Sequence, residues 1–210
     1  MVDRRATSPG AQEARREQLL AVAAGLLDRW SYSDVTMARI AEQASVAKGT
    51  LYLYFRTKET LFLALFEERL NAWYAELQAL ADHGEGAVDP SEAARVIASS
   101  LSRRPTLVHL FGLLHSTLGL NIDLETATAF RLRQHDRISA LASSLAKRVG
   151  NLSTSRALCF LVQLEVVVGG LSWAAHPPPP VAEALKEEQL AAFRIDFEEE
   201  LREIATALLK

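Results

Sequence analysis

The sequence has little of the chemistry that disulfides, metal centres and common active sites require. A single cysteine, Cys159, occurs among 210 residues, so no disulfide forms within the chain and no CxxC pair exists to bind a metal. No glycine-rich phosphate loop, nucleophile elbow or pair of catalytic carboxylates stands out. The sequence therefore predicts neither an enzyme nor a bound cofactor or metal. A lone thiol is typical of a reducing, cytoplasmic setting.

Long apolar segments are also scarce. Two arginines near the N-terminus have no apolar run behind them, which argues against a signal peptide. The single tempting stretch is 157–176, and it carries Glu165 at its centre beside Gln163. A carboxylate there costs about 2.5–3.5 kcal/mol in a bilayer. The segment is therefore predicted to be a buried helix at a subunit interface and not a membrane span.

Charge is unevenly distributed along the chain. The composition is that of a globular protein, with 49% hydrophobic and 23% charged residues and a net charge of −3. Residues 1–60 carry nine Lys and Arg against seven Asp and Glu, or +2, and the remainder carries 14 against 19, or −5. The weak positive excess permits nucleic-acid binding at one end. An acidic chain argues against indiscriminate coating of DNA, which needs many phosphate contacts.

Hydrophobic periodicity predicts helices almost everywhere, with no strand pattern and no internal repeat. We expect an all-α fold of about nine helices. Thr36 is placed to cap a helix over 37–44, and Thr57 to cap a longer helix that continues past Trp73. After a loop at 83–91, further helices are expected near 91–103, 105–118, 122–149, 153–175 and 183–209.

Four consecutive prolines, 177–180, separate the last two of these helices. They are interpreted as a stiff extended connector, because proline-rich segments span about 3.1 Å per residue. The alternative is a docking site for a partner with an aromatic groove. The pattern favours the connector.

Residues 37–55 have the dimensions of a helix-turn-helix, whose second helix enters the major groove of DNA. Leu51 and Phe55 lie four apart and face the core, whereas Lys48, Thr50 and Tyr54 point elsewhere. Gly49 removes a side chain where the helix end must approach a sugar-phosphate backbone. Free N–H groups at that end favour a phosphate.

The segment from Thr36 to Leu61 closely resembles the DNA-binding signature of TetR-type transcriptional regulators. The resemblance covers about residues 15–62 and rests on a continuous pattern of caps, core positions and polar positions: Thr36, Ile40, Ala41, Ala44, Val46, Lys48 to Tyr52, Tyr54, Phe55, Lys58, Glu59 and Leu61. It implies a DNA-binding domain over 1–57, with a short disordered tail, and a helical effector-binding and dimerisation domain over 58–210. The DNA-binding residues that it implies are Thr36, Arg39, Lys48, Gly49, Thr50, Tyr52, Tyr54 and Lys58.

The chain departs from the family pattern near the turn. Ser31 and Ser45 stand where glycine is common, and Ala47 stands where a capping Ser or Thr is usual. The missing cap costs about 1 kcal/mol. Leu53 replaces a residue that often reads bases, so it either contacts a thymine methyl or packs. Tyr52 is open to two interpretations, a core residue or a DNA-facing one.

The resemblance implies that two copies form a four-helix bundle across a two-fold axis. Helix 153–175 is too apolar for a surface, and the last helix carries an apolar stripe. The alternative is that the same residues complete the core of one subunit. The dimer-interface candidates are Glu165, Val166, Gly169, Gly170, Phe193, Phe197 and Leu201.

Aromatic and polar side chains scattered among the middle helices predict a mostly apolar ligand cavity. Each could equally be a core residue or a surface charge. Histidines 109 and 115, six apart without a carboxylate, do not form a metal set. The ligand-binding candidates are His109, Phe111, His115, Phe130, Arg131, Gln163 and Trp173.

Together with these observations, the resemblance implies a homodimeric repressor that binds a palindromic DNA operator and leaves it when a small apolar or aromatic effector binds. Two alternatives stay open: an all-helical carrier or enzyme with a vestigial helix-turn-helix, and a regulator controlled by a protein partner.

Overall fold

A computed structural model describes residues 9–84 and 86–210, apart from the side chain of His115. The described chain is helical without strands, which confirms the predicted all-α class. The expected disordered tail falls mainly on residues 1–8, outside the described residues. The α-helices are α1 (Pro9–Leu27), α2 (Met37–Gln43), α3 (Lys48–Tyr54), α4 (Lys58–His83), α5 (Pro90–Ser102), α6 (Pro105–Leu113), α7 (Leu124–Arg148), α8 (Thr154–Ala175), α9 (Pro179–Ala184) and α10 (Phe197–Leu209).

The chain forms two compact units that divide between Phe66 and Glu67. In the first unit, α2 contacts both α1 and α3. Fully buried aliphatic and aromatic side chains from each helix close its core, and they are Leu19, Leu20, Ile40, Leu51 and Phe62. Leu51 anchors α3 in this core.

Helix α4 begins in the first unit and ends in the second. The backbone N–H of Thr60 donates to Thr57 Oγ1 at 3.1 Å, and that of Thr57 donates to Thr60 Oγ1 at 3.1 Å. Thr57 therefore caps α4 as predicted, in a reciprocal arrangement that satisfies two exposed N–H groups. The sequence-based boundary after residue 57 falls at the first turn of α4, and the compact units divide nine residues later, at Phe66–Glu67.

Helix α8 is the centre of the second unit. It packs against α6, α7 and α10, while α10 also packs along α5. Among the described residues it is the helix that is long and apolar enough to cross a membrane. Its inner face is covered by protein, and Phe160, Leu161, Leu164 and Val168 are buried there. Those contacts identify it as a core helix of this unit.

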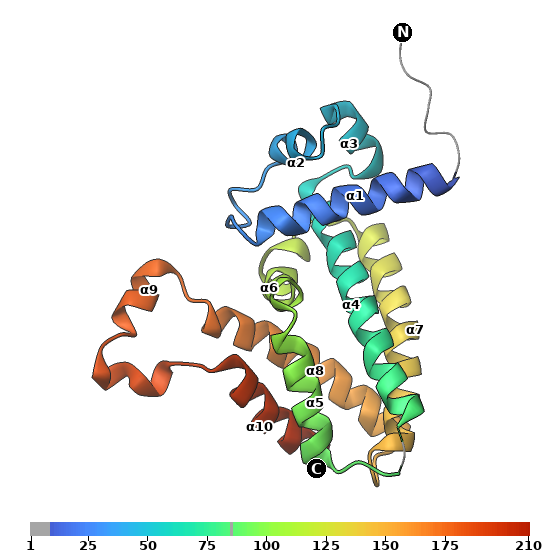
Figure 1. Cartoon of the computed structure of the whole chain (residues 1–210), viewed down its shortest axis with the longest axis vertical. Coiled ribbons are helices and arrows are strands. Elements are labelled where there is room, and N and C mark those ends of the chain that lie inside the picture. Colours follow the sequence, from blue (N-terminus) through green and yellow to red (C-terminus); the bar gives the residue numbers. More distant parts are fainter. Residues whose placement is uncertain (1–8, 85) are drawn as a thin grey trace. The chain divides into compact units, whose positions relative to one another are not determined.

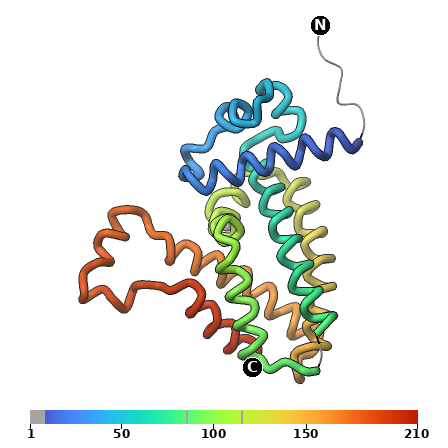
Figure 2. Tube along the Cα trace, in the orientation of Figure 1, coloured from blue at the N-terminus to red at the C-terminus, as the bar shows by residue number. Residues whose placement is uncertain are grey.

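The predicted helix over 183–209 is wrong in its first half. Instead, α9 is followed by a 3₁₀ turn, Glu188–Phe193, and then by α10. Neither α9 nor the 3₁₀ turn contains a buried residue. Figures 1 and 2 show this segment leaving the end of α8 and returning to α10 as an arm. We call residues 177–196 the arm.

The four prolines behave differently from a uniform connector. Pro178 is extended, at φ −56° and ψ 152°, but Pro179 is the first residue of α9. Proline suits that position because its missing N–H would have no partner in the first turn of a helix. The extended interpretation therefore fails from Pro179 onward.

Candidate functional site

Helix α3 presents a polar outer face on an apolar support. Leu51 is fully buried and Phe55 is nearly so, whereas Tyr52 is 50% exposed and Leu53 is 86% exposed. Lys48 and Gly49 are exposed at the helix start. Tyr52 is therefore not a core residue. The exposed Leu53 does not pack within the chain, which leaves it free to contact a ligand.

The first helix of the motif is capped as the sequence predicts. Thr36 Oγ1 accepts a hydrogen bond from the backbone N–H of Arg39 at 3.2 Å. At α3, Ala47 is the capping residue and makes no side-chain cap. Ala47 therefore provides no side-chain acceptor for the first backbone N–H groups of α3.

Ser45 adopts a backbone conformation that favours glycine. Its φ is +55°, in the left-handed region that costs an L-residue about 1–2 kcal/mol. This conformation lets Val46 N donate to Ala41 O at 2.9 Å and reverses the chain before α3. Ser31 does not adopt this conformation.

Replacing Ser45 by Gly should stabilise the helix-turn-helix. Glycine removes the left-handed strain but adds backbone entropy to the unfolded chain, so we expect a gain of about 0.5–1 kcal/mol. Thermal unfolding followed by circular dichroism measures the effect. Ser45→Ala is the matched control, because alanine also lacks the hydroxyl but keeps a Cβ at the left-handed φ, so it should give no such gain. A lower melting temperature for Ser45→Gly would contradict this account of the turn.

Two of the predicted DNA-binding cations already have partners inside the first unit. Lys58 Nζ donates to Tyr32 O at 2.7 Å and to Val35 O at 2.9 Å, and it lies 3.8 Å from the centre of the Tyr32 ring. Burial lowers the pKa of Lys58, against the opposing effect of Glu59 and Asp34. Lys58 thus ties the loop before α2 to the first turn of α4.

Arg39 is held on the same side of the unit. Its guanidinium lies 4.2 Å from the centre of the Trp30 ring, and Nη1 donates to Asp34 O at 3.2 Å. Thr36 is exposed, and Thr50 and Tyr54 are half-buried. The exposed members of the predicted set are therefore Thr36, Lys48, Gly49 and Tyr52.

A buried polar cluster lies inside the second unit. It includes Glu165, which the sequence analysis assigned to the dimer interface. The Tyr74 hydroxyl, on α4, donates to Glu165, on α8. Gln134 Nε2, on α7, donates to both Glu165 carboxylate oxygens, at 2.9 and 2.7 Å. Burial, followed by the nearby Glu165 charge, raises the pKa of Tyr74 well above its usual value. The cluster joins three helices through one carboxylate.

The predicted ligand-binding residues differ in burial within the second unit, and of them Trp173 lines one of the described pockets. Phe111 and Phe130 are buried in packing, and the Phe111 ring meets Trp73 at a centroid distance of 6.3 Å. Arg131 is exposed and donates to Gln134 Oε1 at 2.7 Å. Gln163 and Trp173 lie on the exposed face of α8, His109 is half-buried, and the His115 side chain lies outside the described residues.

The predicted dimer residues divide between the interior and the surface. Glu165, Gly169 and Leu201 are buried within the unit, as the alternative that they complete the core of one subunit predicts. Phe197 is half-buried, and Phe193 is exposed on the arm instead of on α10. Val166 and Gly170 are exposed on α8. They belong to a stripe at helical spacing that we call the α8 outer face: Cys159, Val162, Gln163, Val166, Gly170 and Trp173.

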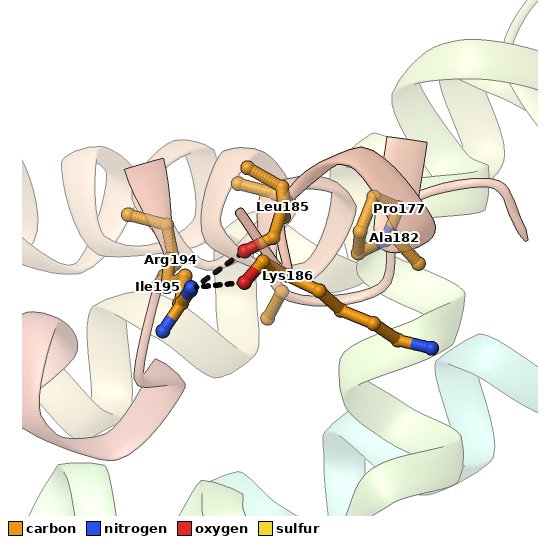
Figure 3. A pocket seen from close by; sticks show the side chains of 8 residues that line it. Pro177, Ala182, Leu185, Lys186, Arg194 and Ile195 are labelled. Atoms are coloured by element: carbon orange, nitrogen blue, oxygen red, sulfur yellow. Dashed lines mark hydrogen bonds between the residues drawn. The ribbon is translucent and has the colours of Figure 1, made fainter. Parts of the chain in front are cut away.

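Three pockets are described in the second unit. Two lie beside the arm, with volumes of about 510 and 560 Å³, and Trp173 lines the larger one. In the smaller of these, Arg194 Nε donates to Leu185 O at 2.7 Å and Nη2 donates to Lys186 O at 2.9 Å (Figure 3). A third pocket, of about 300 Å³, lies between α4, α5 and the end of α7. No group of three or more potential metal ligands occurs in the described part of the chain.

The fold and the exposed α3 define a helix-turn-helix protein with a separate helical C-terminal unit. Comparison with known families agrees over nearly the whole chain. Residues 19–65 match the family described as bacterial regulatory proteins, tetR family, and residues 67–210 match the tetracyclin repressor-like C-terminal domain. The chain belongs to the tetR family of bacterial regulatory proteins.

Individual relatives are more distant. The fatty acid metabolism regulator protein of Bacillus subtilis is 32% identical over 85 residues, which are 40% of this chain and 43% of that protein. A tetR transcriptional regulator from Rhodococcus sp. RHA1 has a TM-score of 0.60 at 19% identity, covering 94% of this chain and 96% of its own. FadR from Thermus thermophilus, in complex with lauroyl-CoA, has a TM-score of 0.57 at 20% identity, covering 92% of each chain. The two structures show a shared fold, and the first match spans less than half of its relative.

Proposed function

We propose that the chain is a homodimeric, cytoplasmic transcriptional regulator that represses by binding a palindromic operator and is released by a small ligand with an apolar part. The observation that carries this proposal is the outer face of α3. Lys48, Gly49, Tyr52 and Leu53 are exposed there without a packing role, on a helix that Leu51 fixes from behind. An exposed helix of this kind is the part that a helix-turn-helix places in the major groove.

Dimerisation follows from the spacing of DNA half-sites. Two recognition helices must reach half-sites about 34–36 Å apart, or a multiple of this distance, so two copies must be held at a fixed separation. The α8 outer face supplies an exposed apolar stripe, with Val162 51% and Val166 61% exposed. Gly170 leaves open space where a side chain would stand. We propose that this face pairs with its copy.

Ligand response requires a link between the two units, and α4 provides one by continuity of the chain. The same helix carries Lys58 in the first unit and Tyr74 in the second. A ligand can shift the equilibrium away from DNA binding as far as it binds the DNA-free geometry more tightly. The acyl-CoA bound to the Thermus FadR makes a ligand with an apolar chain the first class to test.

Lys48→Ala should weaken operator binding about tenfold or more, because a lost phosphate contact costs about 1.5–3 kcal/mol for a charged hydrogen bond. The affinity should fall on every DNA sequence tested. The slope of the logarithm of the binding constant against the logarithm of the salt concentration should become shallower by about one. Fluorescence anisotropy with the DNA flanking the protein's own gene measures both quantities.

Lys147→Ala is the matched control, since Lys147 is an exposed lysine of the second unit. Its affinity should equal that of the unaltered protein. Equal DNA affinity for Lys48→Ala would argue for the carrier or enzyme alternative, as would the absence of any protected palindrome at moderate salt.

A further inference from the structure

The pocket between α4, α5 and the end of α7 has an apolar lining and a single described cation. Its volume is about 300 Å³. Apolar side chains from the three helices form most of its wall, with Arg148 and Glu92 as its described charged residues. The lining residues that the argument uses are Leu77, Leu80, Val96, Ile97, Leu145 and Arg148.

Arg148 is positioned by its backbone and by a close glycine. Arg148 O accepts from Val88 N at 2.8 Å, and Val88 O accepts from Gly150 N at 3.2 Å, so the end of α7 is fixed. A Cβ at Gly84 would lie 2.4 Å from Arg148 Nη2, which shows that the guanidinium rests against a backbone without a side chain. The guanidinium therefore has a defined place at the pocket.

One guanidinium nitrogen of Arg148, Nη1, is buried and has no hydrogen-bond partner among the described residues. The neighbouring Glu92 does not serve, because Arg95 engages both of its carboxylate oxygens, at 2.6 and 2.7 Å. A buried donor without an acceptor is costly, and a charged one more so. Arg148 is the last residue of α7, where the helix dipole favours a positive charge. The dipole does not provide a hydrogen-bond acceptor for Nη1.

We propose that this pocket binds an amphipathic monoanion, an unbranched apolar chain that ends in a carboxylate held by Arg148. The fork of N–H groups on a guanidinium matches the two oxygens of a carboxylate. Arg148 supplies one positive charge, and the carboxylate of Glu92 nearby repels additional negative charge. The pocket therefore suits a ligand with one negative charge better than a phosphate monoester, which carries two. A volume of about 300 Å³ holds about ten water-sized groups, so a chain of about ten carbons fits.

The pocket could act on the DNA-binding unit because α4 forms one of its walls. Leu77, Leu80 and Ala81 line it, and they belong to the helix that begins at Lys58. This consequence rests on the proposed function, whereas binding of the anion does not. Occupancy would release DNA if the ligand binds more tightly to the α4 geometry of the DNA-free state.

Isothermal titration calorimetry with decanoate and decanol tests the site in the full chain. We expect decanoate to bind at least tenfold more tightly than decanol, because decanol has the same tail without the charge. Arg148→Gln should weaken decanoate binding about 10- to 100-fold and leave decanol binding unchanged. Lys147→Gln, the adjacent exposed cation on α7, is the matched control and should bind decanoate normally.

A second variant keeps the test decisive if Arg148→Gln does not fold. Val96→Phe leaves the arginine in place and fills the apolar part of the pocket, so it should weaken both compounds at least tenfold. Equal affinities for decanoate and decanol, no binding of decanoate, or normal binding by both variants would overturn the proposal. An operator complex that forms but ignores decanoate, while decanoate binds the free protein, would overturn only the regulatory consequence. Failure to bind any operator would instead count against the proposed function.

Discussion

Val166→Glu is expected to convert the proposed dimer into a monomer and to lower operator affinity by more than 100-fold. Val166 is 61% exposed at the middle of the α8 outer face. In a two-fold interface each substitution is made twice, so two carboxylates would meet where two valines packed. An unpaired buried charge costs several kcal/mol, more than an interface of ordinary stability tolerates. A monomer then engages one half-site at a time.

Sedimentation velocity and anisotropy on the same sample separate the two effects. Leu132→Glu is the control, because Leu132 is 63% exposed on α7 and lies off the α8 outer face. It should remain dimeric and bind normally. A dimeric Val166→Glu protein with unchanged operator affinity would show that subunits pair through another surface.

Glu165→Ala is expected to destabilise the second unit by about 3 kcal/mol or more. The carboxylate is the acceptor for the Tyr74 hydroxyl and the Gln134 amide, and all three side chains are buried. Its removal leaves two buried donors without an acceptor, each costing about 1–3 kcal/mol. A cavity adds to the loss. Urea unfolding followed by tryptophan fluorescence, to which Trp73 buried beside Tyr74 contributes, measures the change.

Two further substitutions define the cause. Glu165→Gln keeps the shape and one acceptor oxygen, so it should cost roughly half as much as Glu165→Ala. Glu203→Ala removes an exposed carboxylate from α10 and should change stability by about 0.5 kcal/mol or less. If Glu165→Ala were as stable as Glu203→Ala, the cluster would not hold α4, α7 and α8 together.

Local chemistry made the first unit predictable. The caps at Thr36 and Thr57 act through atoms three residues away, so sequence spacing alone identifies them. The missing cap at Ala47 and the unusual residue at Ser45 can be recognised in the sequence for the same reason. The left-handed φ of Ser45 is seen only in the structure. The pattern from Thr36 to Leu61 was long enough to carry the family.

Tertiary packing decided the second unit. Helix α8 is apolar around most of its circumference, so its periodicity does not show which side meets α6, α7 and α10. That contact placed Glu165 inside and left Val166, its neighbour in sequence, outside. The arm also depends on contacts that the sequence pattern does not show. The pattern over 183–209 predicts one helix, but in the structure the Arg194 side chain donates to the carbonyls of Leu185 and Lys186, just after α9.

The sequence by itself determined the helical class, the helix-turn-helix and the family, because each depends on residues a few positions apart. Only the tertiary structure decided which apolar residues stay exposed and which polar ones are buried. It also decided where Arg148 lies, against Gly84 and beside the walls of α4 and α5. These features join residues far apart in the sequence: Glu165 lies 31 positions from Gln134 and 91 from Tyr74. No local pattern specifies such a pairing.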